Sequence, residues 1–240
     1  MAFSVVVEGM EYAGKTTLAD NLVASFQEME GVDVLQVREP GGTEIGEEIR
    51  LMLKGPLAPN LDPMTNLYLY TAGRNELFEK VIVPFRETHP KGITVSDRSW
   101  PSTFVHQSMD GVNYEDVYNS QRKFMDYPDL ILFLDINSEL AYQRALLSRN
   151  EGRAFDHRDA KTIVEFEVER RRYMEVLKPH LGRVEVVDGS VTPEEVLRET
   201  RMRVIRRIAE RENDESSRDF WHTELQKDIG NFRNGNPERK

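Results

Sequence analysis

Near its start the chain reads Gly9-Met10-Glu11-Tyr12-Ala13-Gly14-Lys15-Thr16. This run fits G-x-x-x-x-G-K-[ST], the pattern of a phosphate-binding loop, or P-loop. An apolar, β-branched segment at residues 3–7 precedes it, and Leu18, Leu22 and Phe26 follow at helical spacing. The run therefore lies between a predicted strand and a predicted helix, which is the context that a P-loop requires.

The chemistry expected of this loop follows from its backbone. Glycine residues let the chain curl until several N–H groups point inward, and these donors act with the positive end of the following helix to hold a polyphosphate. Lys15 would reach the outer phosphates, and the Thr16 hydroxyl would bind Mg²⁺. We therefore expect an ATP-like polyphosphate and Mg²⁺ at this loop.

The composition limits the partners of the chain. It has 240 residues, a formal net charge of -10 and no cysteine, so we expect one α/β domain without disulfides or thiolate chemistry. Nucleic acids and membranes attract positive charge, so neither is an expected partner, and nucleotide phosphates must meet a local basic pocket. The first strand leaves no room for a signal peptide, and no apolar run approaches the ~20 residues of a membrane span, which predicts a cytoplasmic protein.

Five apolar runs predict strands, at residues 4–8, 33–37, 92–96, 129–136 and 183–187. Helix-periodic stretches separate them. This alternation predicts a parallel five-stranded sheet that is covered on both faces by helices. Because ligands bind beyond the carboxyl ends of the strands in such sheets, the site is expected where these runs end.

Two of these ends carry candidate site residues. Asp97-Arg98 follows the third strand, where the carboxylate could hold Mg²⁺ through water and the guanidinium could clamp a phosphate, although a purely structural ion pair is the alternative. After the second strand, Thr43 is a good N-cap for a helix over 44–54. The pattern alone favours an ordinary ion-paired residue on a solvated helix end for Arg50.

Three further segments bear on the architecture. Pro84 predicts a kink or a break in the helical stretch 61–89, in which Gly73 admits either a ligand or a close neighbouring helix. The charged loop 150–158 between two helices predicts a lid that closes over phosphates. Residues 1–211 are expected to form the domain, and residues 212–240 a polar C-terminal extension that is partly disordered, in which Trp221 could dock on the same chain or on a partner.

Taken together, the motifs resemble the thymidylate kinase family, of the bacterial and phage kind. The resemblance rests on residues 8–17, on the diagnostic run Arg38-Glu39-Pro40-Gly41-Gly42-Thr43, and on Asp97-Arg98 followed by Ser102 and Thr103. It covers residues 3 to 209 in element order. It implies a P-loop kinase fold with a helical lid, and transfer of the γ-phosphoryl group of ATP to dTMP, giving dTDP. It also implies a homodimer.

The resemblance implies a role for individual residues as well. The ATP-binding set is Gly9, Glu11, Tyr12, Ala13, Gly14, Lys15, Thr16 and Thr17. The metal set is Thr16 and Asp97. The substrate-binding set is Glu11 for the sugar 3′-hydroxyl, Arg50 and Arg98 for the phosphate, Tyr70 for stacking on the base, Arg74, Thr103 and Gln107 for the base, together with Arg38 and Pro40. For Arg50, the phosphate-binding role replaces the ordinary ion pair that the pattern alone favours.

The catalytic set that the resemblance implies is Lys15, Arg98, Arg153 and Arg149. The P-loop position that carries an arginine finger in the eukaryotic type is Tyr12 here. The lid should therefore supply the finger, with Arg153 as first choice and Arg149 as second.

Three departures from the family pattern leave the acceptor base open. Tyr12 is bulkier than the small residue expected, Asp156-His157 replaces an Asp-Arg pair of the lid, and Ser99 stands where an aromatic residue is common. The alternative function is a kinase for another deoxynucleoside monophosphate, whose base is uracil, a modified pyrimidine or a purine. A nucleotide-dependent switch is disfavoured, because this chain carries neither Asn-Lys-x-Asp nor Asp-x-x-Gly at the right place. An inactive scaffold is disfavoured because the chain retains a full set of site residues, namely Lys15, Thr16, Arg50, Asp97 and Arg98.

Overall fold

The computed structural model describes residues 2–150, 161–212 and 214–233. At its centre lies a sheet of five strands in the order β2-β3-β1-β4-β5. The strands are β1 (Phe3–Gly9), β2 (Val34–Arg38), β3 (Ile93–Asp97), β4 (Leu130–Asp135) and β5 (Val184–Asp188). All four neighbouring pairs are parallel. Each strand falls on a predicted apolar run, so the expected five-stranded parallel sheet is confirmed.

The register of the sheet brings the predicted site segments together. Asp97 at the end of β3 is paired with Val7 of β1 on one side and with Arg38 of β2 on the other. Gly9 at the end of β1 is paired with Leu134 of β4. The carboxyl ends of these strands thus meet at one edge of the sheet, where the following loops can share a ligand.

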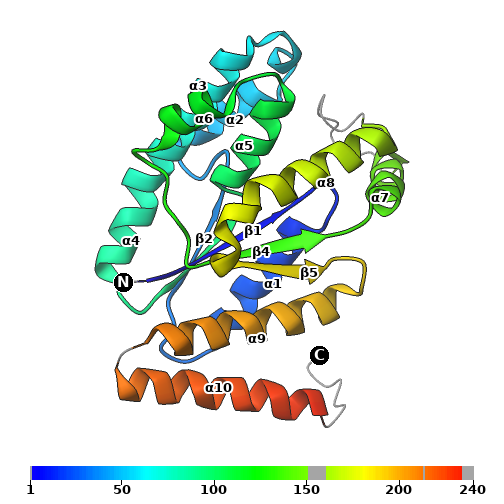
Figure 1. Cartoon of the computed structure of the whole chain (residues 1–240). Coiled ribbons are helices and arrows are strands. Elements are labelled where there is room, and N and C mark those ends of the chain that lie inside the picture. The colour runs from blue at the N-terminus through cyan, green and yellow to red at the C-terminus, as the bar shows by residue number, and fades with distance from the viewer. Residues whose placement is uncertain (1, 151–160, 213, 234–240) are drawn as a thin grey trace.

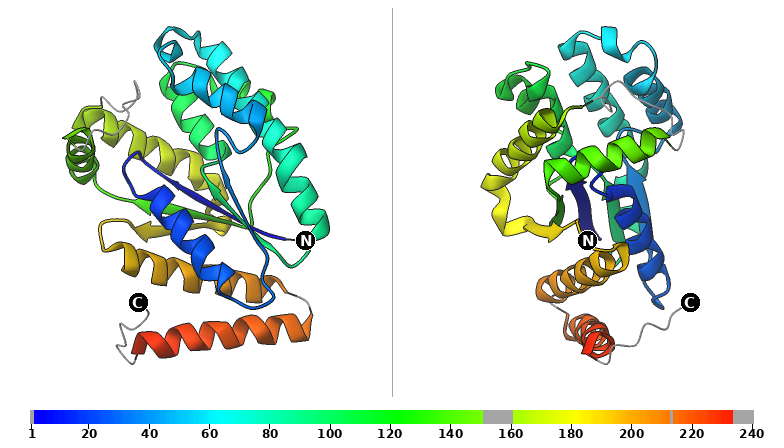
Figure 2. Two further views of the ribbon diagram at one scale, coloured as in Figure 1. Left: turned by 180° about the vertical axis from the view of Figure 1, so that it is seen from behind. Right: turned by 90° about the vertical axis from the view of Figure 1, so that its right-hand side faces the viewer.

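Helices cover both faces of this sheet (Figures 1 and 2). Their bounds are α1 (Lys15–Gln27), α2 (Glu44–Lys54), α3 (Pro63–Leu77), α4 (Val83–Thr88), α5 (Trp100–Met109), α6 (Tyr114–Gln121), α7 (Ser138–Asn150), α8 (Ile163–Leu177), α9 (Pro193–Arg211) and α10 (Glu215–Arg233). Helices α1 and α9 pack together, and so do α5 and α8. Figures 1 and 2 show α8 and α1 on opposite faces of the sheet, as a doubly wound α/β fold requires. Helices α2 and α6 both pack on α3.

The long helical stretch before β3 is divided as Pro84 predicts. A π-helical segment, η2 (Phe78–Ile82), joins α3 to α4, and Pro84 lies in the first turn of α4. Proline lacks an N–H and its ring clashes with the carbonyl four residues earlier, so a wider turn before it relieves the conflict.

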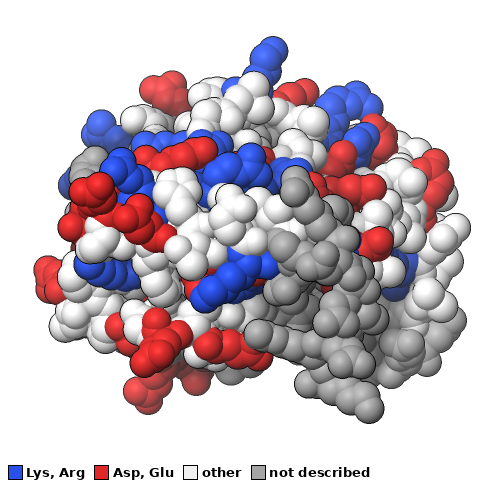
Figure 3. All heavy atoms as spheres, turned by 90° about the horizontal axis from the view of Figure 1, so that it is seen from below, with Lys and Arg blue, Asp and Glu red and all other residues white. Residues whose placement is uncertain are grey.

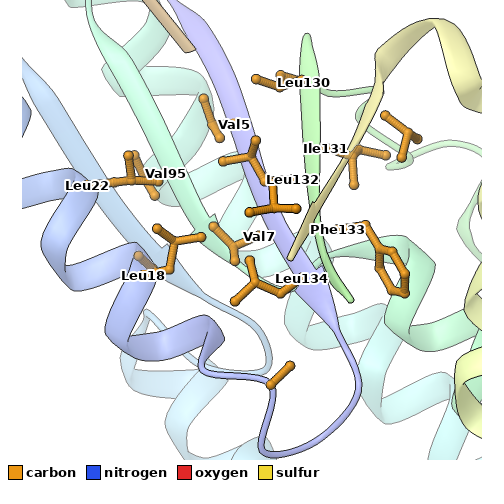
Figure 4. Packing of buried hydrophobic residues seen from close by; sticks show 14 of the residues in the cluster. Val5, Val7, Leu18, Leu22, Val95, Leu130, Ile131, Leu132, Phe133 and Leu134 are labelled. Atoms are coloured by element: carbon orange, nitrogen blue, oxygen red, sulfur yellow. The ribbon is translucent and has the colours of Figure 1, made fainter. Parts of the chain in front are cut away.

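The core lies between the sheet and its helices. Figure 4 shows Val7 and Leu132 directed toward Leu18 and Leu22 of α1, whereas Phe133 points to the opposite side of β4. All five of these side chains are at most 3 % exposed. Successive side chains of a strand point to opposite faces, so a continuous apolar run such as β4 fills the core on both sides. This buried sheet holds the loops at its carboxyl edge in place.

The C-terminal extension differs from the prediction. Residues 215–233, expected to lie outside the core and in part disordered, form α10, which packs along α9 (Figure 1). Trp221 is only 6 % exposed and belongs to the main core cluster, and the Arg201 guanidinium of α9 pairs with Asp228. Trp221 therefore docks on its own chain. The boundary proposed after residue 211 falls between α9 and α10, and remains a prediction.

Candidate active site

The P-loop joins β1 to α1 in a path that only glycine permits at its first residue. Gly9 has a φ of +152°, and a Cβ there would lie 2.6 Å from the carbonyl oxygen of Leu134. Gly14, with a φ of +99°, precedes the first residue of α1. The loop consequently passes close to β4 and presents the N-terminus of α1 to the edge of the sheet, the arrangement that favours a bound anion.

Lys15 lies inside this loop. Its Nζ donates a hydrogen bond of 2.6 Å to the carbonyl oxygen of Met10, and the side chain is buried. Burial lowers the pKa of Lys15 to about 7, and repulsion from Arg98 acts in the same direction. Asp97, Glu169 and Glu11 oppose this shift only in part. The amine is therefore placed where added negative charge, such as a phosphate, would favour its protonated form.

Thr16 and Asp97 form the centre that could hold Mg²⁺. The Thr16 hydroxyl donates a 2.6 Å hydrogen bond to Asp97 Oδ2. The other carboxylate oxygen, Oδ1, is buried without a hydrogen-bond partner in the described part of the chain. The described residues hold no group of three or more His, Cys, Asp or Glu side chains fit for a metal. One carboxylate and one hydroxyl suit Mg²⁺, which usually takes its other ligands from water and substrate phosphates.

Arg98 is fixed by a network behind the cavity. Its backbone is left-handed, with a φ of +73°, and its Nη1 donates 3.0 Å hydrogen bonds to Ser102 Oγ and to the Tyr173 hydroxyl. Ser102 in turn donates to Glu8, which also accepts the backbone N–H of Ser99 at the start of α5. Burial alone would lower the pKa of Arg98, but the Tyr173 hydroxyl and the carboxylates of Glu8, Glu11 and Asp97 raise it above its usual value. Arg98 is thus a fixed cation.

A cavity of about 790 Å³ opens at this edge of the sheet. The predicted residues that line it are Glu11, Tyr12, Gly14, Lys15, Thr16, Thr17, Arg38, Pro40, Arg50, Tyr70, Arg74, Asp97, Arg98, Thr103 and Gln107. The lining also includes Glu39, Lys54, Ser102, His106 and Arg144. Lysine and arginine outnumber aspartate and glutamate in this lining, although the chain as a whole has a net charge of -10. The cavity is therefore the local basic pocket that nucleotide phosphates require.

Two arginines line the cavity from the end of β2 and from α2. Arg50 Nη1 donates a 2.9 Å hydrogen bond to the carbonyl oxygen of Pro40. Glu47, which could have paired with Arg50, instead accepts from Arg38 at 3.1 Å and from the Gly42 N–H at 2.8 Å. The Arg38–Glu47 pair is about half exposed, with 47 % exposure for each side chain. Arg50 therefore lines the cavity, and the ordinary ion pair of α2 belongs to Arg38.

A further set of lining residues is fixed by polar contacts. Arg74 donates to Glu39 Oε2 at 2.6 Å, to Thr103 Oγ1 at 2.8 Å and to Gln121. Gln107 Nε2 donates to Asn66 Oδ1 at 3.2 Å, and its Oε1 is buried without a partner in the residues that the structure describes. A buried acceptor that lacks a donor costs free energy unless a ligand satisfies it. Gln107, which lines the cavity, thus has an amide oxygen that lacks a donor among the described residues.

Gly73 is explained by helix packing. A Cβ at this position would lie 3.6 Å from Ile49 Cγ2 of α2, an ordinary van der Waals contact. Of the two explanations that the sequence left open, a ligand or a neighbouring helix, the structure supports the helix, which is α2.

The remaining predicted residues lie elsewhere. Gly9 and Ala13 are buried P-loop residues that do not face the cavity. Arg149 lies near the end of α7 and is absent from the cavity lining. Arg153, the first choice for the arginine finger, and the lid pair Asp156-His157 lie outside the described residues.

Several site residues escaped the sequence reading. Arg144 of α7 lines the cavity and donates to the carbonyl oxygens of Tyr12 at 3.3 Å, Ala13 at 3.4 Å and Gly189 at 3.1 Å. It therefore supports the P-loop from outside. Tyr173 of α8 holds Arg98, as described above. Neither residue belongs to a motif, and only the position of α7 and α8 at the carboxyl edge of the sheet could have indicated them.

Comparisons with known proteins agree with this geometry. A family model described as thymidylate kinase matches residues 7–200. The thymidylate kinase of Mesoplasma florum is 30 % identical over 208 residues, which cover 85 % of this chain and 95 % of that protein. The enzyme of Shouchella clausii is 31 % identical over 199 residues, covering 82 % and 91 %. That of Geobacillus thermodenitrificans is 31 % identical over 217 residues, covering 88 % and 94 %.

The matched region begins inside β1 and ends within α9, so it contains the P-loop, Asp97-Arg98 and the whole described lining of the cavity. The fold and the family match thus agree on the same residues. The chain belongs to the thymidylate kinase family and is an ATP- and Mg²⁺-dependent nucleoside monophosphate kinase with a P-loop kinase fold.

Proposed function

We propose that this chain transfers the γ-phosphoryl group of ATP to dTMP by in-line displacement, giving dTDP and ADP. The observation that carries the proposal is that one cavity is lined both by the P-loop residues Lys15 and Thr16 and by the base-recognising candidates Thr103 and Gln107. Phosphoryl transfer needs little covalent chemistry from the protein, because alignment of the two phosphates and stabilisation of their charge supply most of the rate.

On the donor side, the P-loop from Gly9 to Thr17 holds the ATP phosphates and Lys15 binds the outer ones. Thr16 and Asp97 hold Mg²⁺, which neutralises charge on the transferring phosphates when it is bound. Arg144 supports the loop by binding its carbonyl oxygens. Replacing Lys15 by methionine or Thr16 by alanine should abolish turnover while the protein keeps its circular dichroism spectrum.

On the acceptor side, Arg50 and Arg98 clamp the phosphate of dTMP, with Arg38 and Pro40 nearby. Glu11 accepts a hydrogen bond from the sugar 3′-hydroxyl, and Tyr70 stacks on the base. These roles rest on the family resemblance and on the presence of all these residues in the cavity lining.

Base selection depends on Gln107, Thr103 and Arg74. The unsatisfied Oε1 of Gln107 accepts the N3–H that thymine and uracil carry and cytosine lacks. Arg74 and Thr103, which bond to each other, provide donors for a base carbonyl oxygen. This arrangement favours thymine or uracil over cytosine, so a kinase for dUMP or a modified uracil nucleotide is the second candidate.

A panel of deoxynucleoside monophosphates in a coupled assay of ADP release tests the proposal. We expect dTMP to be the best acceptor and dCMP to be poor. Gln107→Leu should lower kcat/KM for dTMP by roughly 10- to 100-fold, the effect of one lost hydrogen bond in a buried site. Ser108→Ala is the matched control on α5, because Ser108 bonds to the carbonyl of Val105 and lies outside the cavity lining. A wild-type protein that phosphorylates dTMP poorly and another monophosphate well would reject the dTMP assignment.

The catalytic arginine of the lid is a separate part of the proposal. Arg153 is the first choice for the finger and Arg149 the second. Arg153→Ala should lower kcat by a factor of roughly 10³ or more with little change in either KM, because a finger acts on the charge of the transition state. An effect confined to KM would count against this role.

We also propose that the protein is a cytoplasmic homodimer whose partners are nucleotides and not nucleic acids. The resemblance supports the dimer, and exposed apolar side chains such as Leu51 and Tyr68 offer material for an interface. On the face that Figure 3 shows, basic and acidic side chains of the described residues are interspersed and form no continuous basic surface for a nucleic acid. None of the helices in the described ranges could span a membrane. Sedimentation at several protein concentrations measures the assembly state.

A further inference from the structure

A buried ion cluster lies behind the part of the cavity that Glu11 lines. Lys161, just before the cap residue of α8, donates from Nζ to Glu11 Oε2 at 2.7 Å and to Glu169 Oε2 at 2.8 Å. The Lys161 side chain is 10 % exposed and that of Glu169 is fully buried. Glu11 is part of the described cavity lining, whereas Lys161 and Glu169 are not. The ammonium therefore stands between the P-loop and α8, with a carboxylate on each side.

The same cluster also holds the backbone of the P-loop. The backbone N–H of Glu11 donates to Glu169 Oε1 at 3.3 Å, and His106 Nε2 lies 3.9 Å from that same oxygen. Glu11 is thus held at two points, through its backbone by Glu169 of α8 and through its side chain by Lys161, which precedes that helix. Both contacts fix the direction in which its carboxylate points. The bond to Lys161 uses Oε2, so Oε1 can accept a hydrogen bond from a ligand.

Charge balance explains why the cluster needs its lysine. Burial alone would raise the pKa of Glu11, but Lys161 is the largest of the influences that lower it below its usual value, followed by Arg98. Burial would lower the pKa of Lys161, yet Glu11 and Glu169 raise it. Without the ammonium, two buried carboxylates would face each other, and like charges at such distances favour protonation of one of them or its movement toward water.

We propose that Lys161 and Glu169 are positioning residues that hold Glu11 as an oriented, ionised hydrogen-bond acceptor for the 3′-hydroxyl of the acceptor nucleotide. This inference rests on the proposed function, in which Glu11 contacts that hydroxyl. A fixed, charged acceptor gives a stronger hydrogen bond than a neutral or mobile one. The cluster therefore sets how strongly the enzyme prefers an acceptor with a 3′-hydroxyl over one without it.

The test compares dTMP with 3′-deoxythymidine monophosphate as acceptors. For the wild-type enzyme we expect kcat/KM to favour dTMP by roughly 10- to 100-fold, the range for one hydrogen bond to a charged group. Lys161→Met should reduce this ratio to within about threefold of unity, chiefly through a higher KM for dTMP, while the 3′-deoxy acceptor changes little. Lys161→Gln serves the same test if the methionine variant does not fold.

Two further variants separate positioning from a general structural effect. Arg170→Met removes the bidentate pair of Arg170 with Asp135 on the same helix, at 2.6 and 2.7 Å, and should leave the acceptor ratio unchanged. In a Glu11→Gln background, Lys161→Met should change the ratio no further, because Lys161 acts through Glu11.

The outcomes distinguish this inference from the proposed function. If the wild-type protein phosphorylates neither acceptor, the proposed function itself fails. If it uses dTMP but shows no preference over the 3′-deoxy acceptor, or if Lys161→Met lowers kcat/KM equally for both acceptors, the positioning role is rejected while the kinase assignment stands. An additional effect of Lys161→Met in the Glu11→Gln background would also reject it.

Discussion

Binding of ATP should be accompanied by uptake of a proton at Lys15. In the protein without nucleotide, burial and the nearby Arg98 lower the pKa of Lys15 to about 7. The phosphates of ATP bring negative charge to the ammonium, and an opposite charge at contact distance favours the charged form. The pKa of Lys15 should therefore rise toward its ordinary value in the complex, and binding must draw a proton from solution at any pH between the two values.

The size of this uptake follows from the lowered pKa. At about pH 8, a lysine with a pKa of about 7 is protonated in roughly one molecule in ten, whereas a lysine with its ordinary pKa of about 10.4 is almost fully protonated. About 0.9 proton should then be taken up for each ATP bound, falling to about 0.2 at about pH 6.5. Because the complex holds more protons than the free protein, affinity should fall as pH rises above 7, by nearly tenfold per unit at about pH 8.

Isothermal titration calorimetry measures this directly. A non-hydrolysable ATP analogue with Mg²⁺ is titrated into the protein at one pH in buffers of different ionisation enthalpy, and the dependence of the observed heat on that enthalpy gives the number of protons. Lys15→Arg is the matched control, because arginine keeps the positive charge and stays protonated throughout. Its uptake should be close to zero. Equal uptake by both proteins, or an uptake below about 0.3 proton at about pH 8 in the wild type, would refute the reasoning.

Three further predictions follow from contacts away from the reacting phosphates. Arg144→Ala leaves the carbonyl oxygens of Tyr12 and Ala13 without their donor, so the Kd for the ATP analogue should rise by roughly tenfold while the KM for dTMP changes little, as fluorescence titration and steady-state kinetics can show. Trp221→Ala should lower the free energy of unfolding by about 3–5 kcal/mol in urea denaturation, with kcat preserved, because α10 packs on α9 and contributes nothing to the described cavity lining. Gly73→Ala should raise the free energy of unfolding by up to about 1 kcal/mol without changing the KM for dTMP, since its Cβ meets only Ile49 at 3.6 Å; a raised KM would place Gly73 beside the base.

Local sequence patterns predicted the sheet because each strand carries its own evidence. A run such as Leu130-Ile131-Leu132-Phe133-Leu134 is apolar throughout and needs no knowledge of its neighbours to be assigned to a buried strand. Helix caps are equally local, and Thr43 caps the helix that it was expected to begin. Helix α10 was missed because its buried contact depends on a few side chains, chiefly Trp221, within a polar segment. The average composition of this segment does not reveal so small an apolar face.

The candidate site divides in the same way. Residues that belong to motifs at the ends of β1, β2 and β3 were found, since the motif fixes their identity and the sheet fixes their position. The sequence did not predict a role for Arg144, Tyr173 or Lys161. These residues belong to no motif and come to the site only through the docking of α7 and α8. In α8, Arg170 makes a bidentate pair with Asp135 of β4, which no local pattern predicts. Charge along a helix does not reveal which side meets the sheet.

The two central cations of the site illustrate what the docking of α8 adds. Lys15 and Arg98 are both buried, and burial lowers the pKa of a cation. The pKa of Lys15 is indeed lowered, whereas that of Arg98 is raised. The difference comes from their neighbours: the Tyr173 hydroxyl and the carboxylates of Glu8, Glu11 and Asp97 outweigh the effect of burial on the pKa of Arg98. At Lys15, burial and repulsion from Arg98 outweigh the carboxylates of Asp97, Glu169 and Glu11. Arg98 is therefore stabilised as a cation by the fold itself and can clamp a phosphate that arrives first. Above about pH 7, Lys15 becomes fully protonated only when ATP supplies the opposing charge, so in that range its protonation reports that the donor is in place.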